Sequence, residues 1–228
     1  MPDRPLPGIV VLISGSGTNL QALIDAVTRG EIPGRIRAVL SNRPGVAGLE
    51  RAERAGIPAQ VIDHRTYPDR ETFDQALMAH IDAHDPALVV LAGFMRVLTP
   101  AFVDHYTGRL INIHPSLLPD FRGLHTHERA LEAGVQTHGC TVHFVNGELD
   151  GGPAIAQAGV PVEANDTPQS LAARVQCQEH RIYPRVVRWF CEGRLKLADD
   201  GQVHLDDQPL QTPLRADEVP ADDRDPPT

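Results

Sequence analysis

Asn112 and His114 stand two positions apart in an apolar segment, so in an extended strand their side chains lie on one face. Pro115 follows directly, which favours an extended His114 and ends the strand. Two polar side chains at the end of a buried strand are costly unless they are hydrogen-bonded or used. An amide and an imidazole together suit acyl transfer, because both can donate to a developing oxyanion and the imidazole can also move a proton. The alternative is a hydrogen-bonded core asparagine beside a surface histidine.

A carboxylate, Asp150, lies in the glycine-rich segment 148–153. This segment predicts a tight loop, since Asp and Gly favour turns. A carboxylate in such a loop can approach a ring nitrogen of His114 and favour the imidazolium, which is the better oxyanion partner. On its own, Asp-Gly-Gly indicates only a turn.

Residues 14–19, Ser-Gly-Ser-Gly-Thr-Asn, separate an apolar run from a helical pattern. Glycines let the backbone approach an anion closely, and a helix N-terminus offers unpaired N–H groups. The segment has neither the Gly-Lys-Ser/Thr of a nucleoside triphosphate loop nor the third glycine of the dinucleotide fingerprint. It therefore predicts a site for a small monophosphate, the alternative being a plain turn that caps a helix. We call residues 14–19 the phosphate loop.

The eleven histidines raise the question of a metal site. His125 with His127, and His138 with His143, are the spacings that could supply ligands. No HExxH motif and no cysteine pair accompany them, so we expect no metal. Cys140 lies close to the predicted site, but in a strand pattern that favours a buried, inert thiol over a nucleophile.

The elements that must position these residues alternate between short apolar runs and helical patterns. Unbroken apolar runs are typical of strands covered on both faces by helices, and such alternation predicts a doubly wound, mainly parallel α/β sheet. The predicted strands are residues 9–13, 36–40, 59–62, 87–92 and 110–114, and helical patterns occupy residues 20–27, 46–55 and 73–81.

The second half of the chain has a different pattern. Residues 140–146 and 154–162 predict an antiparallel pair, separated by turn residues. Thr167 followed by Pro168 is a favourable helix start, and the apolar spacing then predicts one long helix to about residue 191. Pro184 within that pattern predicts a kink.

Length and charge predict one domain, residues 1–206, followed by an acidic, proline-rich and mobile tail, residues 207–228. Of the net charge of −9, the nine acids and two bases after residue 198 contribute −7, which leaves −2 for the rest. A near-neutral body argues against binding to long phosphate backbones. Three cysteines without a CxxC pair, and no apolar run of about 20 residues, predict a cytoplasmic protein without a membrane span.

Taken together, these motifs closely resemble those of the phosphoribosylglycinamide formyltransferase family, over roughly residues 8 to 197. The resemblance implies a Rossmann-like formyltransferase fold, with antiparallel strands in the C-terminal half. It also implies formyl transfer from 10-formyltetrahydrofolate, as co-substrate, to the glycinamide amine of 5'-phosphoribosylglycinamide in purine synthesis. The residues that carry it are segments 9–20, 89–96, 111–119, 123–127 and 148–153.

The resemblance also implies roles for individual residues. The catalytic positions of the family fall on Asn112, His114 and Asp150. Its ribonucleotide-binding positions fall on Gly17, Thr18, Asn19 and Glu179, and its folate-binding positions on Arg70, Met95, Arg96, Val97, Leu98 and Asn112. No metal is implied, and the chain is expected to be a monomer or a homodimer.

Two related activities remain as alternatives. The aromatic-Arg-Gly sequence at Phe121, Arg122 and Gly123 also resembles methionyl-tRNA formyltransferases, but an acidic tail stands where that family has an RNA-binding domain. Formyltetrahydrofolate hydrolases resemble this chain only after an additional N-terminal domain, and Ile9 lies too early to allow one. A nucleotide-binding module without catalysis would have no need of Asn112, His114 and Asp150.

Overall fold

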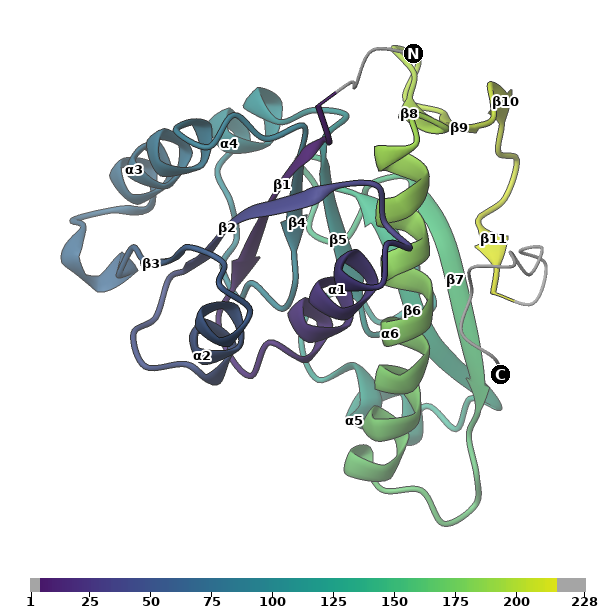
Figure 1. Cartoon of the computed structure of the whole chain (residues 1–228). Coiled ribbons are helices and arrows are strands. Elements are labelled where there is room, and N and C mark those ends of the chain that lie inside the picture. The colour runs from purple at the N-terminus through teal and green to yellow at the C-terminus, as the bar shows by residue number, and fades with distance from the viewer. Residues whose placement is uncertain (1–4, 217–228) are drawn as a thin grey trace.

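A computed structural model describes residues 5–216, in which a central sheet is covered by helices on both faces (Figure 1). The strands of that sheet lie in the order β11-β7-β6-β5-β4-β1-β2-β3. Neighbours from β5 to β3 are parallel, β6 is antiparallel to β5 and to β7, and β11 is parallel to β7. The strands are β1 (Gly8–Ile13), β2 (Arg35–Ser41), β3 (Ala59–Val61), β4 (Leu88–Leu91), β5 (Leu110–His114), β6 (Thr137–Phe144), β7 (Ala154–Pro161) and β11 (Leu214–Arg215).

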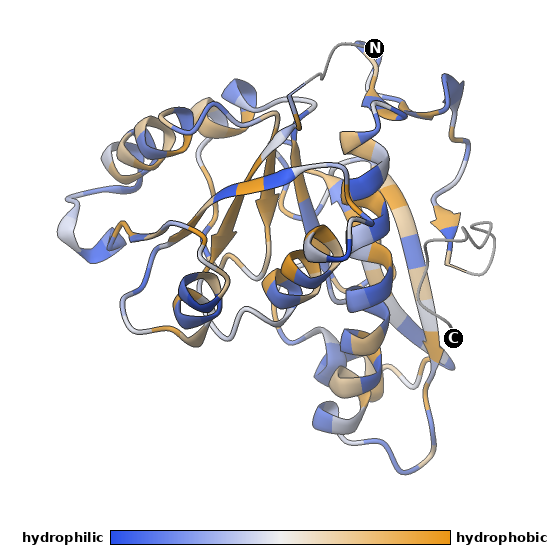
Figure 2. Cartoon of the chain, viewed as in Figure 1, coloured by the Kyte–Doolittle hydropathy of each residue, from blue (hydrophilic) through white to orange (hydrophobic). Residues whose placement is uncertain are grey.

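The buried side chains form two clusters, one on each face of the sheet. Val11 and Ile13 of β1 pack with α1, α2, α5 and α6, whereas Val10 and Leu12 pack with α3 and α4. Figure 2 shows apolar strands in the centre of the molecule, between helices that carry both polar and apolar residues. The helices are α1 (Thr18–Thr28), α2 (Ala47–Arg54), α3 (Arg70–Asp82), α4 (Pro100–His105), α5 (Thr126–Glu132) and α6 (Pro168–Cys191), with a short 3-10 turn η1 (His64–Thr66).

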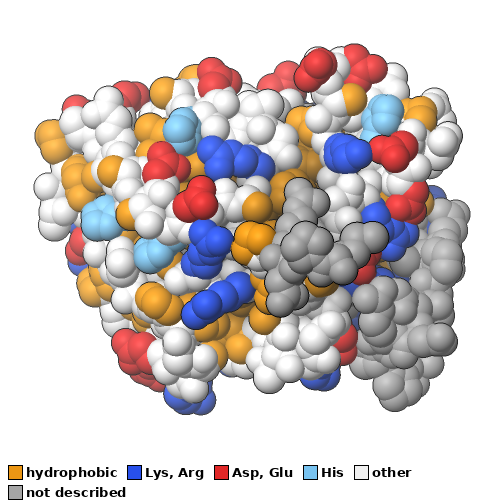
Figure 3. Space-filling model, turned by 45° about the horizontal axis from the view of Figure 1, so that its top comes forward, with side chains coloured by type: hydrophobic (Ala, Val, Ile, Leu, Met, Phe, Trp, Pro, Cys, Tyr) orange, Lys and Arg blue, Asp and Glu red, His pale blue; other side chains and the backbone are white. Residues whose placement is uncertain are grey.

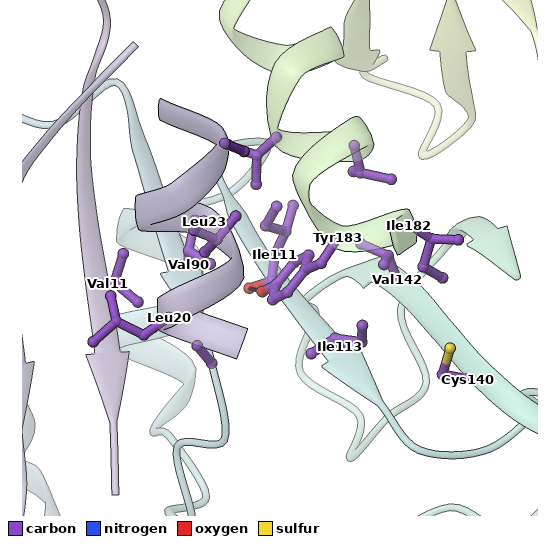
Figure 4. Close-up of a cluster of buried hydrophobic side chains, with 14 of the residues drawn as sticks. Val11, Leu20, Leu23, Val90, Ile111, Ile113, Cys140, Val142, Ile182 and Tyr183 are labelled. Carbon is purple, nitrogen blue, oxygen red and sulfur yellow. Dashed lines mark hydrogen bonds between the residues drawn. The ribbon is translucent and has the colours of Figure 1, made fainter. Parts of the chain in front are cut away.

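The long helix α6 begins where the sequence predicts. The Thr167 hydroxyl accepts from the N–H of Ser170, and the Ser170 hydroxyl accepts from the N–H of Thr167, which makes a reciprocal cap. The helix continues through Pro184 to Cys191. On its buried face, the Tyr183 hydroxyl lies 2.8 Å from the carbonyl oxygen of Leu91 and contacts β5 as well, which ties α6 to the middle of the sheet (Figure 4).

The structure adds elements that the sequence pattern does not predict. Helices α4 and α5 are short, and β8 (Leu195–Leu197), β9 (Val203–Leu205) and β10 (Gln208–Pro209) form a separate antiparallel sheet. Strands β10 and β11 fall within the predicted tail, where Leu210 and Leu214 pack against the main core. Regular structure therefore extends past residue 206, and the predicted mobility of residues 217–228 concerns residues outside the described range. The domain boundary at residue 206 stays a prediction.

Two general properties of the described chain bear on partners. None of the helices within residues 5–216 combines the length and apolar character needed to cross a bilayer. On the face drawn in Figure 3, acidic and basic side chains are interspersed.

The predicted doubly wound sheet is confirmed, and its strand order locates a binding edge. The chain proceeds from β1 through β2 to β3 on one side, and β4 then lies on the other side of β1. Ligands of open α/β sheets bind beyond the carboxyl ends of the strands at such a reversal. The phosphate loop follows β1 at this point, and the polar end of β5 lies one strand further away.

Candidate active site

The structure brings Asn112, His114 and Asp150 together at the carboxyl end of β5. As the spacing predicts, the two β5 side chains share a face, while Ile111 and Ile113 point into the core under α6. Asp150 belongs to the loop between β6 and β7, and its Oδ2 lies 3.4 Å from Nδ1 of His114. The His114 and Asp150 side chains are 7% and 10% exposed, so their interaction is shielded from water.

Both ring nitrogens of His114 have an oxygen partner. Nδ1 faces Asp150, and Nε2 lies 3.0 Å from the carbonyl oxygen of Phe121. Asp150 also accepts from the N–H of Gly123, at 2.9 Å. Phe121 and Asp150 have positive φ values of 54° and 48°, a region that non-glycine residues rarely adopt. The two loops that carry these oxygens are therefore locally strained, and they hold the imidazole between a hydrogen bond at Nε2 and a nearby carboxylate at Nδ1.

The carboxamide of Asn112 is held by a histidine to which the sequence interpretation gave no such role. His143 lies directly opposite Asn112 in the β5–β6 register, and its Nε2 is 3.2 Å from Nδ2 of Asn112. Its Nδ1 lies 2.8 Å from the carbonyl oxygen of Phe144, which identifies Nδ1 as the protonated nitrogen. Burial lowers the pKa of His143, so the ring is neutral and Nε2 accepts a hydrogen bond from Asn112.

The sequence pattern suggested His143 only as a possible metal ligand. The signal that could have revealed its position is the pairing of β6 with β5, whereas the sequence predicts pairing of residues 140–146 only with residues 154–162. His143 also approaches Asp150, with 3.9 Å between Nε2 and Oδ1. It therefore contacts two of the three predicted catalytic positions.

The other histidines do not form a metal centre. His127 and His138 contact each other, with 3.2 Å between ring nitrogens, and burial lowers the pKa of His138 to about 4. His125 points instead to Glu128, at 2.8 Å. Within residues 5–216, no group of three or more His, Cys, Asp or Glu side chains is arranged to hold a metal ion. Burial raises the pKa of the Cys140 thiol, which makes it a poor nucleophile.

The phosphate loop presents the N-terminus of α1 without a side-chain cap. Its N-cap residue, Gly17, has φ of 70°, and a Cβ there would lie 2.6 Å from Cα of Gly48. Only glycine fits this position, which leaves the first N–H groups of α1 available to an anion. Thr18 begins α1, where its hydroxyl accepts from Gln176 of α6.

Glu179 of α6 closes the other side of the phosphate loop. Its Oε2 accepts from Nδ2 of Asn19 at 2.8 Å. Glu179 is 8% exposed, and burial raises the pKa of its carboxyl. The Oδ1 atom of Asn19 is buried without a hydrogen-bond partner among the described residues. These two side chains, 160 positions apart, therefore converge beside the α1 N-terminus, where Oδ1 of Asn19 can still accept a hydrogen bond.

The remaining predicted positions lie on and beside the segment that follows β4. We call residues 93–99 the donor loop, because they include the positions predicted to bind the formyl donor; Met95 and Val97 in this loop are 54% and 55% exposed. The guanidinium of Arg96 lies over the Phe73 ring, 5.7 Å from its centroid, and Leu98 packs against the core under α3. Arg70 begins α3. Burial raises the pKa of the Asp74 carboxyl, and the charges of Arg70 and Arg96 oppose part of that rise. The donor loop thus offers exposed apolar side chains next to two cationic ones.

Comparison with known proteins identifies the family. A sequence profile described as formyl transferase matches residues 8–187. The phosphoribosylglycinamide formyltransferase of Escherichia coli K12 is 56% identical over 202 residues, which cover 89% of this chain and 95% of that protein. The chain belongs to the phosphoribosylglycinamide formyltransferase family. The resemblance inferred from the motifs is therefore confirmed.

Solved structures support the same assignment. The phosphoribosylglycinamide formyltransferase of Coxiella burnetii has a TM-score of 0.88 and 52% identity, and the match covers 93% of this chain and 99% of that one. Glycinamide ribonucleotide transformylase 1 of Symbiobacterium toebii has a TM-score of 0.85 and 48% identity, and the match covers 88% of this chain and 94% of that one. The human trifunctional purine biosynthetic protein adenosine-3 is 46% identical over 195 residues, only 19% of its length. The predicted formyltransferase fold and enzyme class are thus confirmed.

Proposed function

We propose that this chain transfers the formyl group of 10-formyltetrahydrofolate to the glycinamide amine of 5'-phosphoribosylglycinamide, a step of de novo purine synthesis. Family membership supports the reaction. The observation that carries the proposal is the convergence of an amide, an imidazole and a carboxylate at the end of β5, near an uncapped helix N-terminus after β1. That pairing suits acyl transfer to an acceptor that bears a phosphate.

The reaction proceeds by direct attack. The amine nitrogen forms a bond to the formyl carbon, and the carbonyl electron pair moves to the oxygen. Asn112 and the imidazolium of His114 donate hydrogen bonds to this oxyanion, and Asp150 stabilises the charge on His114. The carbon–nitrogen bond to the folate then breaks as the oxyanion collapses. The proton lost by the amine reaches the departing nitrogen, with Asp150 as the relaying carboxylate.

One hydrogen bond must be exchanged before His114 can act. In this structure Nε2 of His114 is engaged by the carbonyl oxygen of Phe121. A formyl oxygen at that nitrogen takes the place of the Phe121 carbonyl, while Nδ1 keeps its contact with Asp150. Donor binding is therefore coupled to a shift of the loop around Phe121.

The two substrates occupy opposite sides of the β1–β4 reversal. The phosphate of the ribonucleotide binds the N–H groups of Gly17, Thr18 and Asn19, and Glu179 accepts from the ribose hydroxyls. The apolar surface of Met95 and Val97 covers the folate ring system, with the backbone of Arg96 and Leu98 at its edge. Arg70, with 44% of its side chain exposed, binds the acidic end of the folate.

The deciding assay offers 10-formyltetrahydrofolate to the purified chain with three acceptors: 5'-phosphoribosylglycinamide, methionyl-tRNA and water. We expect formylated product only with the ribonucleotide. Product only with tRNA would favour the activity suggested by the Phe121-Arg122-Gly123 sequence, and free formate in the absence of an acceptor would favour a hydrolase. A His114→Ala variant in the same assay identifies background transfer by a contaminant.

Two further expectations concern the oligomeric state and the cellular location. We expect a monomer or a homodimer, which sedimentation equilibrium distinguishes. We also propose a cytoplasmic enzyme, because Cys140, Cys177 and Cys191 are all free thiols. Limited proteolysis tests whether the domain ends near residue 206: cleavage there must leave a fragment that retains activity.

A further inference from the structure

We propose that Ser14 is a positioning residue that sets the donor loop against the phosphate loop, and so connects the two substrate sites. The roles of both loops rest on the proposed function. The connection itself rests on a buried hydrogen-bond chain that uses neither Asn112, His114 nor Asp150.

The directions of the hydrogen bonds around Ser14 follow from the atoms involved. The backbone N–H of Met95 can only donate, so Oγ of Ser14 accepts from it, at 2.8 Å. The single hydroxyl proton of Ser14 is then donated to Oδ1 of Asn42, at 2.6 Å. The N–H of Ser14 also donates to the carbonyl oxygen of Gly93, at 3.1 Å. Two separate bonds therefore join the first residue of the phosphate loop to the beginning of the donor loop.

The strand order explains why one serine reaches both partners. Strand β1 lies between β4 and β2, and Ser14, Met95 and Asn42 each follow one of these three strands. Ser14 is 3% exposed and Asn42 is 1% exposed. His64 holds Asn42 from the far side, with Nδ1 2.9 Å from the Asn42 carbonyl oxygen. These hydrogen bonds are thus shielded from water, and they lie at the strand-order reversal where ligands bind.

The donor loop is fixed at both ends and exposed between them. At its far end, the N–H of Thr99 donates to Oδ2 of the buried Asp74, at 2.6 Å. Between the anchors, Met95 and Val97 stand more than half exposed. Because Ser14 holds the backbone of Met95 itself, loss of its hydroxyl frees the exposed segment at the point where it starts.

The effect on the two substrates is unequal. The phosphate loop keeps other supports, since the N–H of Gly48 donates to Gly15 and Nε of Arg51 donates to Ser16. The donor loop loses the only acceptor that the structure gives the Met95 N–H. We therefore expect Ser14→Ala to raise the KM for the formyl donor roughly tenfold, the order expected when a buried N–H loses its partner. The KM for the ribonucleotide and kcat should each change less than about threefold.

Two further variants separate positioning from general damage. Ser14→Thr retains the hydroxyl and should restore the donor KM. Ser41→Ala is the matched control: Ser41 is 1% exposed at the end of the neighbouring strand, and its hydroxyl bonds only to the backbone of Arg43. Ser41→Ala should leave both KM values unchanged.

Amide hydrogen exchange provides a readout that does not depend on activity. In Ser14→Ala, exchange of the Met95 N–H should accelerate about tenfold or more, while amides of α1 keep their wild-type rates. Unchanged Met95 exchange, a donor KM equal to wild type, or equal increases in both KM values would overturn the proposal. Failure of the wild-type chain to formylate the ribonucleotide would instead remove the proposed function, and the exchange result would still test the link between the loops.

Discussion

His143 provides the sharpest test of how the candidate site is built. Its Nε2 accepts a hydrogen bond from the Asn112 carboxamide, and its Nδ1–H is held by the carbonyl oxygen of Phe144. This arrangement points the NH₂ group of Asn112, and not its oxygen, toward the ring. One N–H is used by His143, and the other remains for the developing oxyanion. We therefore predict that His143→Phe lowers kcat although His143 itself does not contact the reacting atoms.

The size of this effect follows from the lost contact. Leaving a buried donor without a partner costs about 1–3 kcal/mol. If that energy is lost from the transition state, kcat falls between roughly 5-fold and 150-fold, at about 1.4 kcal/mol per factor of ten. The upper limit is the loss of a whole oxyanion donor, which costs about 10²–10³ in rate. The KM for each substrate should change little, because His143 is 2% exposed and offers no binding surface.

His143→Gln is the matched control. The amide oxygen of glutamine can occupy the place of Nε2 and accept from Asn112, while the bond to Phe144 is lost in both variants. At saturating substrate, the kcat of His143→Gln should therefore lie within about threefold of the wild-type kcat. Far-UV circular dichroism verifies that both variants fold. A Phe variant with wild-type kcat, or a Gln variant as slow as Phe, would refute the orienting role.

Further predictions address the rest of the site. His114→Ala and Asp150→Ala should each lose about 10²–10³ in kcat while the variants remain folded by circular dichroism; wild-type turnover in either would show that the residue is not catalytic. Gly17→Ala should destabilise the fold by more than the roughly 1–2 kcal/mol of left-handed strain and raise the ribonucleotide KM. Gly30→Ala is the control: Gly30 has a φ of 75°, and a Cβ there would have no atom within 4 Å, so its free energy of unfolding in urea reports the backbone strain alone. Burial lowers the pKa of His138 to about 4 from 6.5, so its contribution to stability is complete above pH 6.5 and is lost as the pH falls through 4. The loss amounts to at most about 3 kcal/mol. In His138→Phe, the free energy of unfolding in urea should therefore depend less on pH between pH 7 and pH 4. An equal loss of stability in that variant would exclude His138 as the cause.

The parts of the site that local pattern determines were predictable. The apolar run and Pro115 delimit β5 at residues 110–114, and the two-residue spacing places Asn112 and His114 on one face. The phosphate loop likewise follows a continuous apolar strand, as the glycine pattern indicates. In each case the signal lies within a few residues, so no knowledge of distant pairing is needed.

The parts that depend on distant pairing were not predictable from pattern. His143 faces Asn112 because β6 is antiparallel to β5 in one particular register, and a shift of one residue would turn it to the other face. The sequence predicts the strand but not this partner. Glu179 and Asn19 present the same difficulty, since they meet across 160 positions. The residue pattern places Asn19 in the phosphate loop, whereas the role of Glu179 is implied only by the family resemblance. The structure shows the hydrogen bond that joins them.

Asp150 shows how a weak local signal acquires meaning from packing. Read alone, Asp-Gly-Gly indicates a turn, but a Cβ at Gly152 would lie 1.9 Å from the carbonyl oxygen of Phe144. The loop therefore returns in direct contact with the end of β6, where Phe144 also accepts from the ring of His143. Glycine at position 152 permits this close approach, and the approach brings the preceding carboxylate to His114. The double glycine thus indicates that the loop packs closely against β6, and that packing places Asp150 beside His114.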